Sequence, residues 1–98
     1  MALNIVIKPL AELDLEEAVE WHEEQKEKLG EEFLFEFRDA IRIVARSPFG
    51  FRKRLKSIRA FALKRFHYNV YYIITPETLF VIAVVHQKRS PKTWKKRK

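Results

Sequence analysis

The most informative stretch of this chain is Leu79-Phe80-Val81-Ile82-Ala83-Val84-Val85, which is apolar throughout. A run of this length without polar–apolar alternation is typical of a central strand that is covered on both faces. The turn-forming residues 75–78 (Thr-Pro-Glu-Thr) precede it. In residues 68–74 the even-numbered side chains face one way and the odd-numbered ones the other, which predicts a second strand. The two segments therefore predict an antiparallel pair.

The remaining elements lie on the N-terminal side of this pair. Residues 3–8 form a short β-branched run that stops at Pro9, a residue suited to the first turn of a helix. Three–four spacing of apolar residues predicts a helix from there to about residue 29, with Gly30 at its C-terminal cap. A second helix contains Phe33 and Phe37 and ends at Ser47-Pro48. The sequence predicts a short basic strand over residues 54–58 and further β structure over residues 61–75.

These elements predict one α+β domain. Their order is β-α-α-β-β-β, with a helical hairpin packed on a mostly antiparallel sheet. A chain of 98 residues matches the usual size of a single domain, about 100–150 residues, so we assign residues 1–98 to it. Residues 90–98 form a basic tail, and the sequence leaves open whether this tail is flexible or ordered.

Composition excludes several classes of protein. The chain has no Cys, which excludes disulfide scaffolds, thiolate zinc sites and cysteine nucleophiles. His22 lies beside Glu23, but a metal needs three or four convergent ligands, so we expect no metal and no cofactor. No apolar run approaches the length of about 20 residues that crosses a membrane. We therefore expect a cytoplasmic protein without a membrane partner.

The formal net charge of +7 conceals a division along the chain. Residues 1–39 hold 12 acidic residues against 4 basic ones, a net charge of −8, whereas residues 40–98 hold 16 basic residues and only Glu77, a net charge of +15. Such a division indicates a surface that faces a polyanion, an acidic partner, or both. The alternative is a surface that is merely well solvated.

Basic residues are interleaved with aromatic ones in the second half, a combination that suits RNA phosphates and unstacked bases. The rings of Phe49, Phe51 and Trp94 could equally be core or capping residues. The residues that we predict to bind a partner or nucleic acid are Arg54, Arg59, Lys64, Lys88, Lys92 and Trp94.

Two histidines and two arginines are candidates for chemistry. His67 and His86 lie at the start of one predicted strand and the end of the next, where they could exchange protons as a pair or serve only as hydrogen-bonded structural residues. Arg59 and Arg65 each lie among apolar residues at a predicted strand start. A guanidinium there must find a carboxylate, a carbonyl or a phosphate. No Gly-rich phosphate loop, Ser-His-Asp set or paired-carboxylate site is present.

Three segments carry a resemblance that covers nearly the whole chain. They are Ala-Glu-Leu-Asp-Leu-Glu-Glu at residues 11–17, IRAFALKRFHYNVYY at residues 58–72 and IAVVHQKRSPKTW at residues 82–94. Their order and spacing resemble the RelE/ParE toxin superfamily. The resemblance implies the toxin of a type II toxin–antitoxin pair, neutralised by a small acidic antitoxin.

The superfamily divides into two functional groups, and the resemblance implies different residues for each. RelE-like members cleave mRNA in the ribosome. By that resemblance Arg65, His86 and Arg89 (or Lys88) would be catalytic, with His67 as a further candidate, but the terminal catalytic Tyr is missing and Trp94 stands nearest to it. An indole cannot transfer a proton as a phenol does.

The ParE-like members act on DNA gyrase and lack this catalytic set. Arg59 and Phe66-His67-Tyr68 look closer to them, with His67 in place of a Pro. The first hypothesis is thus a ParE-like toxin, and the alternatives are a ribosome-dependent endoribonuclease or an inactive relative retained as a binding module.

Overall fold

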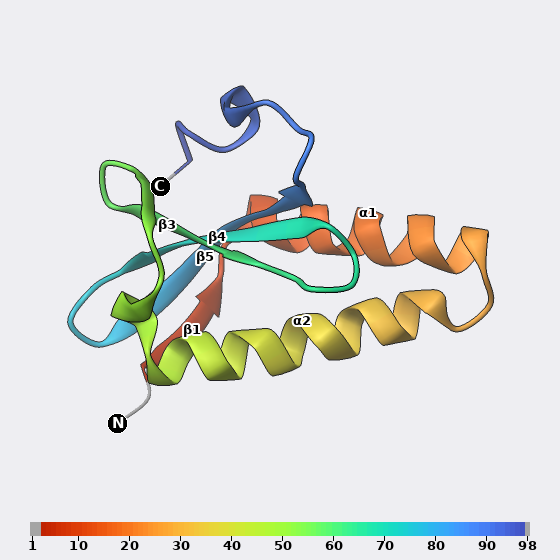
Figure 1. Cartoon of the computed structure of the whole chain (residues 1–98), viewed down its shortest axis with the longest axis horizontal. Coiled ribbons are helices and arrows are strands. Elements are labelled where there is room, and N and C mark those ends of the chain that lie inside the picture. Colours follow the sequence, from red (N-terminus) through yellow and green to blue (C-terminus); the bar gives the residue numbers. More distant parts are fainter. Residues whose placement is uncertain (1–2, 98) are drawn as a thin grey trace.

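The computed structural model describes residues 3–97. Its elements follow one another as β1 (Asn4–Ile7), α1 (Pro9–Gln25), α2 (Leu29–Arg46), a 3₁₀ turn η1 (Pro48–Gly50), β2 (Lys53–Leu55), β3 (Ile58–Ala62), β4 (Tyr68–Ile74), β5 (Thr78–His86) and a 3₁₀ turn η2 (Pro91–Thr93). Figure 1 shows the two helices side by side against one face of the sheet. The predicted α+β class and element order are confirmed, with one additional strand.

The additional strand arises in the basic segment, for which a single strand over residues 54–58 was predicted. The chain instead makes a hairpin, β2–β3, that reverses at Lys56 and Ser57. Lys56 has a φ of 50°, a left-handed conformation that is uncommon for a residue other than glycine. Because this turn contains no glycine, the sequence carried no signal that the chain reverses there, and residues 54–58 were predicted to form one strand.

The sheet has the strand order β1-β5-β4-β3-β2, and β5 lies between β1 and β4. β1 pairs with β5 in parallel, and the other pairs are antiparallel. The prediction of a central strand is confirmed, because β5 buries Leu79, Val81 and Val84 on the helical face and Ile82 and Val85 on the other. The ladder with β4 shifts at Ile82, since Tyr71 lies opposite Ala83 but Tyr72 lies opposite Val81.

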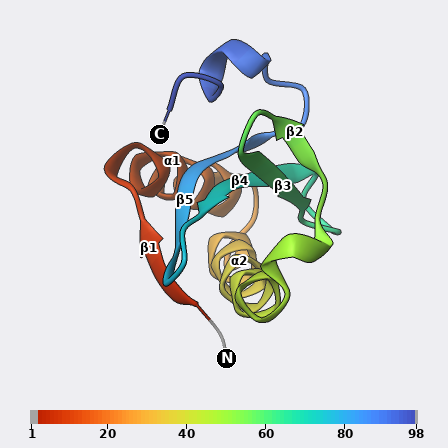
Figure 2. The same ribbon diagram turned by 90° about the vertical axis from the view of Figure 1, so that its left-hand side faces the viewer.

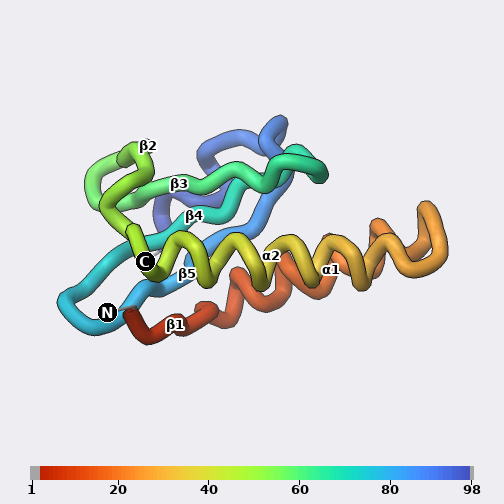
Figure 3. Tube along the Cα trace, turned by 60° about the horizontal axis from the view of Figure 1, so that its bottom comes forward, coloured from red at the N-terminus to blue at the C-terminus, as the bar shows by residue number. Residues whose placement is uncertain are grey.

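Helix α2 supplies most of the helical side of the core. Phe33, Phe37 and Val44 lie on one stripe of this helix and are at most 2% exposed. Helix α1 buries only Ala11, Ala18 and His22, and Figure 3 shows it running alongside α2. Because its buried face is narrow, α1 leaves most of its carboxylates in solvent.

His22 is part of this core. Its Nδ1 lies 2.6 Å from the carbonyl oxygen of Ala18, and its ring stacks on Phe33 with the centroids 4.7 Å apart. Within residues 3–97, no three His, Asp or Glu side chains are grouped closely enough to hold a metal ion. His22 is therefore a packing residue.

The link between the helices differs from the prediction that Gly30 caps α1. Lys28, with a φ of 70°, makes the reversal, and the Glu23 carboxylate accepts hydrogen bonds from the backbone N–H groups of Lys28 (2.8 Å) and Gly30 (3.0 Å). Gly30 lies inside α2, where an added Cβ would stand 2.6 Å from the carbonyl oxygen of Val19. The glycine is required for the close approach of the two helices.

The second face of the sheet is covered by the C-terminal segment, the basic tail whose order the sequence left open. Figure 2 shows this segment on the side of the sheet opposite α2. The Trp94 ring stacks on Tyr71 with the centroids 4.0 Å apart and the planes at 18°. Arg97 forms an ion pair with Asp14 of α1, with 2.6 Å between nitrogen and oxygen. An aromatic stack and an ion pair thus fix residues up to 97, while Lys98 lies outside the described residues.

The same ion pair protects the outer edge of β5. Lys8 donates its N–H to the Val81 carbonyl (2.9 Å), where the pairing with β1 ends. Beyond that point, Arg97 Nη1 donates to the Ile82 carbonyl (3.1 Å), and the Val84 N–H donates to Asp14 (3.0 Å). Side chains therefore satisfy the edge groups that a strand would otherwise pair.

No helix in the described part of the chain is both long and apolar enough to cross a membrane.

Candidate functional site

A cleft lies where the ends of β4 and β5 meet the flank of α1. Tyr68 pairs with His86 across the two strands, and their rings are 5.4 Å apart between centroids at 77°. Arg89 lies just beyond the end of β5 on the same cleft, which has a volume of about 210 Å³. The lining residues are Asp14, Glu17, Ala18, Trp21, Tyr68, Val84, Val85, His86 and Arg89. The cleft therefore brings a phenol, an imidazole and a guanidinium together.

Electrostatics at the cleft act in opposite directions on Tyr68. Burial raises the pKa of the Tyr68 phenol above its ordinary value, and the positive charge of Arg89 partly offsets this increase. His86 Nδ1 accepts a hydrogen bond from the backbone N–H of Lys88 (3.1 Å). When the ring is neutral, its proton is thus on Nε2. The phenol of Tyr68 therefore stays protonated near neutral pH and can donate a hydrogen bond beside the imidazole of His86.

Two carboxylates line the same cleft from α1. Asp14 is engaged by Arg97, whereas Glu17 is exposed to solvent. Negative groups that line the same cleft as Arg89 weaken the attraction of the cleft for a phosphate. The site is of mixed charge, because α1 from the acidic half of the sequence forms one wall and residues 68–89 from the basic half form the other.

Arg65 is not part of this cleft. Its guanidinium pairs with Glu32 of α2 at 2.6 Å, and its backbone N–H donates to Glu36 (3.2 Å). The guanidinium also lies 5.0 Å from the centroid of the Phe66 ring. Of the three residues predicted to be catalytic, the structure brings His86 and Arg89 together and leaves Arg65 at α2.

His67 and His86 are neighbours through the backbone. The carbonyl oxygen of His67 accepts the N–H of Gln87 (2.8 Å), and His67 has a φ of 57°. Among the described residues, no hydrogen bond or ring contact joins the two imidazoles. Proline is locked near −65°, so the backbone here also differs from what the Pro of ParE-like chains would adopt.

Arg59 binds a backbone carbonyl, which is one of the three partners predicted for it, the others being a carboxylate and a phosphate. Its Nη1 donates to the carbonyl oxygen of Phe51 (2.6 Å), and its guanidinium lies 5.2 Å from the centroid of the Phe49 ring. Beside it, the Tyr72 hydroxyl donates to the Pro48 carbonyl (2.8 Å). Burial raises the pKa of Tyr72 to about 12, and the charge of Arg59 acts against this increase. These bonds fix η1 against the sheet and leave Phe49 70% exposed.

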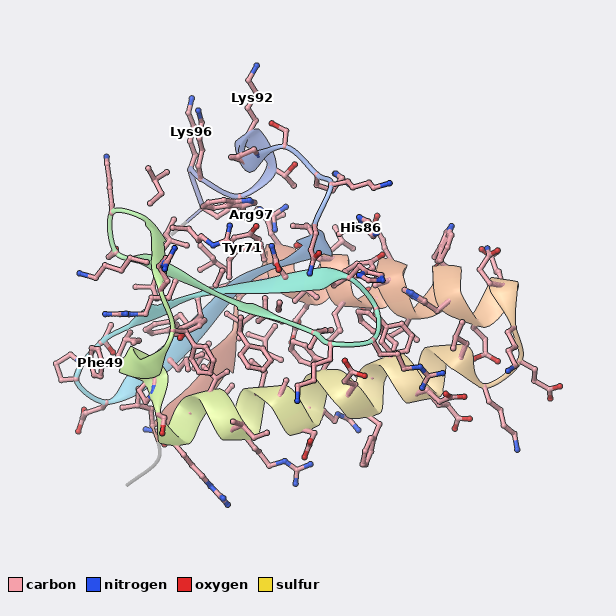
Figure 4. The ribbon with its side chains drawn as sticks, viewed as in Figure 1. Phe49, Tyr71, His86, Lys92, Lys96 and Arg97 are labelled. Atoms are coloured by element: carbon pink, nitrogen blue, oxygen red, sulfur yellow. The ribbon has the colours of Figure 1, made fainter. Side chains whose placement is uncertain are left out.

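Trp94 was predicted to bind a partner or nucleic acid, and the structure corrects this assignment. The ring is 5% exposed and stacks on Tyr71, so it cannot also stack on a base. Figure 4 shows Tyr71 and Arg97 beneath the tail, whereas Lys92 extends away from it. The other predicted binding residues are exposed cations, namely Arg54, Lys64, Lys88 and Lys92.

Sequence reasoning missed Tyr68, Trp21 and Asp14 as parts of the cleft. Part of the signal for Tyr68 was available, because a regular hairpin from the turn at residues 75–78 places position 68 opposite position 85, next to His86. The register shift at Ile82, which moves the pairing to His86, could not be read from the sequence. Nothing in the spacing of α1 indicated that its carboxylates would meet the end of β5.

Comparisons with known proteins agree with this geometry. A search of curated proteins found no significant match. Among solved structures, the chain is similar to a protein described as "Chromosomal ParDE TA system from P. aeruginosa", with a TM-score of 0.64 and 12% sequence identity over 87% of this chain and 96% of that one. At that identity the likeness establishes the fold alone.

The family comparison reaches further. The model of the ParE toxin of the type II toxin–antitoxin system parDE matches residues 5–91. That match extends from β1 through the cleft to the first residue of η2. The predicted resemblance to the RelE/ParE superfamily, closer to its ParE-like members, is confirmed: the chain belongs to the ParE toxin family of type II toxin–antitoxin systems.

Proposed function

We propose that this protein inhibits bacterial growth by binding DNA gyrase and that a small acidic antitoxin neutralises it. The observation that carries the proposal is the incomplete assembly of the nuclease residues. His86 and Arg89 share a cleft, but Arg65 is paired with Glu32 on α2 and the aromatic residue of the tail, Trp94, is buried. Binding to a target protein requires no such assembly.

The charge distribution supports the antitoxin as a partner. All aspartates and glutamates except Glu77 lie in α1, α2 or the link between them. Most of the basic residues lie in or after β2, on the sheet, its turns and the tail, so an acidic protein would be attracted to the sheet side. Both partners act in the cytoplasm, where we place the protein.

One observation favours the ribosome-dependent endoribonuclease as an alternative. Tyr68 lies against His86 and close to Arg89, so the cleft supplies the phenol that the tail lacks. In that mechanism Tyr68 and His86 would move protons while Arg89 stabilised the charged phosphate.

Induction of the chain without its neighbour in a bacterium separates the two mechanisms. The gyrase proposal predicts growth arrest with trapped gyrase–DNA breaks and intact mRNA, and it predicts that Tyr68→Phe still produces these breaks. Rapid ribosome-linked cuts in mRNA that Tyr68→Phe abolishes would instead establish the nuclease.

A second induction tests neutralisation. Co-expression of a short acidic protein from the adjacent reading frame should restore growth and form a complex with the toxin. If the induced protein is expressed and soluble but causes no growth defect, it is an inactive relative retained as a binding module, and the proposal is wrong.

A further inference from the structure

A groove on the non-helical face joins two segments that are far apart in the sequence. One wall is the β2–β3 turn and the other is the C-terminal segment, and the groove has a volume of about 250 Å³. Its lining residues are Leu55, Lys56, Ser57, Ile58, Ile73, Lys95 and Lys96. The stack of Trp94 on Tyr71 holds the second wall in place.

The cations of this groove form no ion pair with a carboxylate of residues 3–97. The ion pairs in residues 3–97 are Arg65–Glu32 and Arg97–Asp14, and neither involves Lys56, Lys95 or Lys96. The carboxylates lie on the helices or at Glu77, and none lines the groove. Figure 4 shows Lys96 extending away from the sheet while the neighbouring Arg97 turns back toward it. The groove therefore has a rim of free positive charge.

The floor of the groove is aliphatic. Ile58 is buried, Ile73 is partly buried, and Leu55 is 37% exposed at the mouth. The two rings close by, Tyr71 and Trp94, are 4% and 5% exposed and stack on each other. Single-stranded nucleic acid is held by stacking on exposed rings and by fork-shaped arginine contacts, and the lining of this groove offers neither. An apolar floor with a lysine rim instead complements a peptide that carries one aliphatic side chain among carboxylates.

We propose that this groove binds an extended acidic segment of a partner protein, with an aliphatic side chain in the floor and carboxylates on Lys56, Lys95 and Lys96. The inference rests on the proposed function only in naming the antitoxin as the protein that supplies the segment. The groove is separate from the cleft of His86 and Arg89, because the two share no lining residue.

Titration of the full chain with a defined probe tests the groove. The probe is a short fluorescent peptide in which one leucine is flanked on both sides by glutamates, and its binding is followed by fluorescence anisotropy at moderate salt for every variant. Reversing two rim charges in Lys56→Glu/Lys95→Glu should weaken binding about tenfold, because each attraction becomes a repulsion. The control Lys26→Glu/Arg42→Glu changes the net charge equally at exposed positions on the link and α2, and it should change the affinity by less than about twofold at moderate salt. Thermal melts followed by circular dichroism establish that each variant is folded.

Two further probes test the chemistry of the occupant. A peptide with serine in place of the leucine should bind more weakly to the wild-type chain, because the floor then has no apolar partner. A fluorescent single-stranded oligonucleotide should bind no more tightly than the peptide. Equal weakening in the control variant, indifference to the leucine, or tighter binding of the oligonucleotide that depends on Lys56 and Lys95 would overturn the proposal.

The two proposals fail separately. A chain that is not toxic, or that an acidic neighbour does not neutralise, contradicts the proposed function, and the peptide titration still measures the groove. Conversely, if the antitoxin neutralises Lys56→Glu/Lys95→Glu as well as it neutralises the wild type, the antitoxin is not the source of the segment.

Discussion

The carboxylate of Asp14 connects three parts of the molecule that are distant in sequence, and its removal is the sharpest test of the fold. It accepts hydrogen bonds from the Val84 N–H (3.0 Å), from Arg97 Nη1 (2.6 Å) and from Arg97 Nη2 (3.4 Å). The side chains of Arg97 and Asp14 are 18% and 14% exposed. Asp14→Ala therefore leaves a backbone donor and a guanidinium without partners at a largely buried position.

The expected cost follows from these contacts. A hydrogen bond to a charged group contributes about 1.5–3 kcal/mol, and breaking a fully buried ion pair costs about 3–5 kcal/mol. Because this pair is accessible to some water and can relax, we expect Asp14→Ala to lower the free energy of unfolding by about 2–4 kcal/mol. For a domain of this size, this corresponds to a fall in Tm of about 10–25 °C. Asp14→Asn retains an oxygen for Val84, so we expect about half the loss.

Urea unfolding followed by circular dichroism measures these values. Comparison of Asp14→Ala, Arg97→Ala and the double variant should give a coupling energy of about 1–3 kcal/mol. Glu20→Ala, at an exposed position on the same helix, is the control and should change stability by less than about 0.5 kcal/mol. If the two substitutions are additive, or if Asp14→Ala costs no more than the control, the ion pair does not hold the tail and the reasoning is refuted.

Substitutions at three other positions test separate contacts of the fold. Trp94→Ala should lower the free energy of unfolding by about 3–4 kcal/mol because it empties a core site. Trp94→Phe should lower it by less than about 1 kcal/mol, since the indole Nε1–H is buried without a hydrogen-bond partner in the described structure. Equal losses for the two variants in denaturant titrations would contradict this difference. Gly30→Ala should lower stability by about 2 kcal/mol because its Cβ would meet the Val19 carbonyl at 2.6 Å, although the same change in an open helix stabilises by about 0.5–1 kcal/mol; a stabilised variant in thermal melts would disprove the close approach. Burial raises the pKa of Tyr72 to about 12 from the ordinary 10.0, so the neutral phenol stabilises the folded state fully below pH 10. The folded state loses up to about 3 kcal/mol of this stability as the pH rises toward 12. Tyr72→Phe should therefore unfold less steeply over this pH range than the wild type, and identical alkaline profiles would contradict the shift.

Much of the fold could be predicted because apolar patterns report burial directly. The uniform apolar run of β5 correctly indicated a strand that is buried on both faces, and the alternation in β4 correctly indicated a neighbouring strand. The stripe of Phe33 and Phe37 indicated the buried face of α2. Each pattern depends only on the side chains of its own element. For this reason the class and the order of the elements followed from the sequence.

The turns were predicted less well for a specific physical reason. Three reversals or irregular positions use Lys28, Lys56 and His67 with positive φ, while neither glycine has a positive φ. Rules that assign chain reversals to glycine therefore misplaced the cap at Gly30 and missed the β2–β3 hairpin. The stabilising contacts at these positions come from other segments, as when Glu23 binds the start of α2.

The candidate cleft and the tail required tertiary information. The resemblance to RelE-like chains grouped His86 and Arg89 as catalytic candidates at the end of the last strand, and the two residues share the cleft. The separation of Arg65 depends on Glu32, and the burial of Trp94 depends on Tyr71, so neither outcome is encoded in local spacing. The same holds for the groove, since its lysines come from segments about 40 residues apart.

The parallel pairing of β1 with β5 has a consequence for synthesis of the chain. Asn4 is synthesised well before Thr78, which is its partner in the ladder. The helical hairpin and the β2–β3 hairpin can form from local contacts, whereas β1 and β4 both border a strand that emerges late. A chain interrupted before residue 78 would have neither the central strand nor the Arg97 contact that holds its edge. We therefore expect ribosomes that stop before this strand to release only unfolded fragments, so that the folded toxin forms only after β5 and the Arg97 contact have been synthesised.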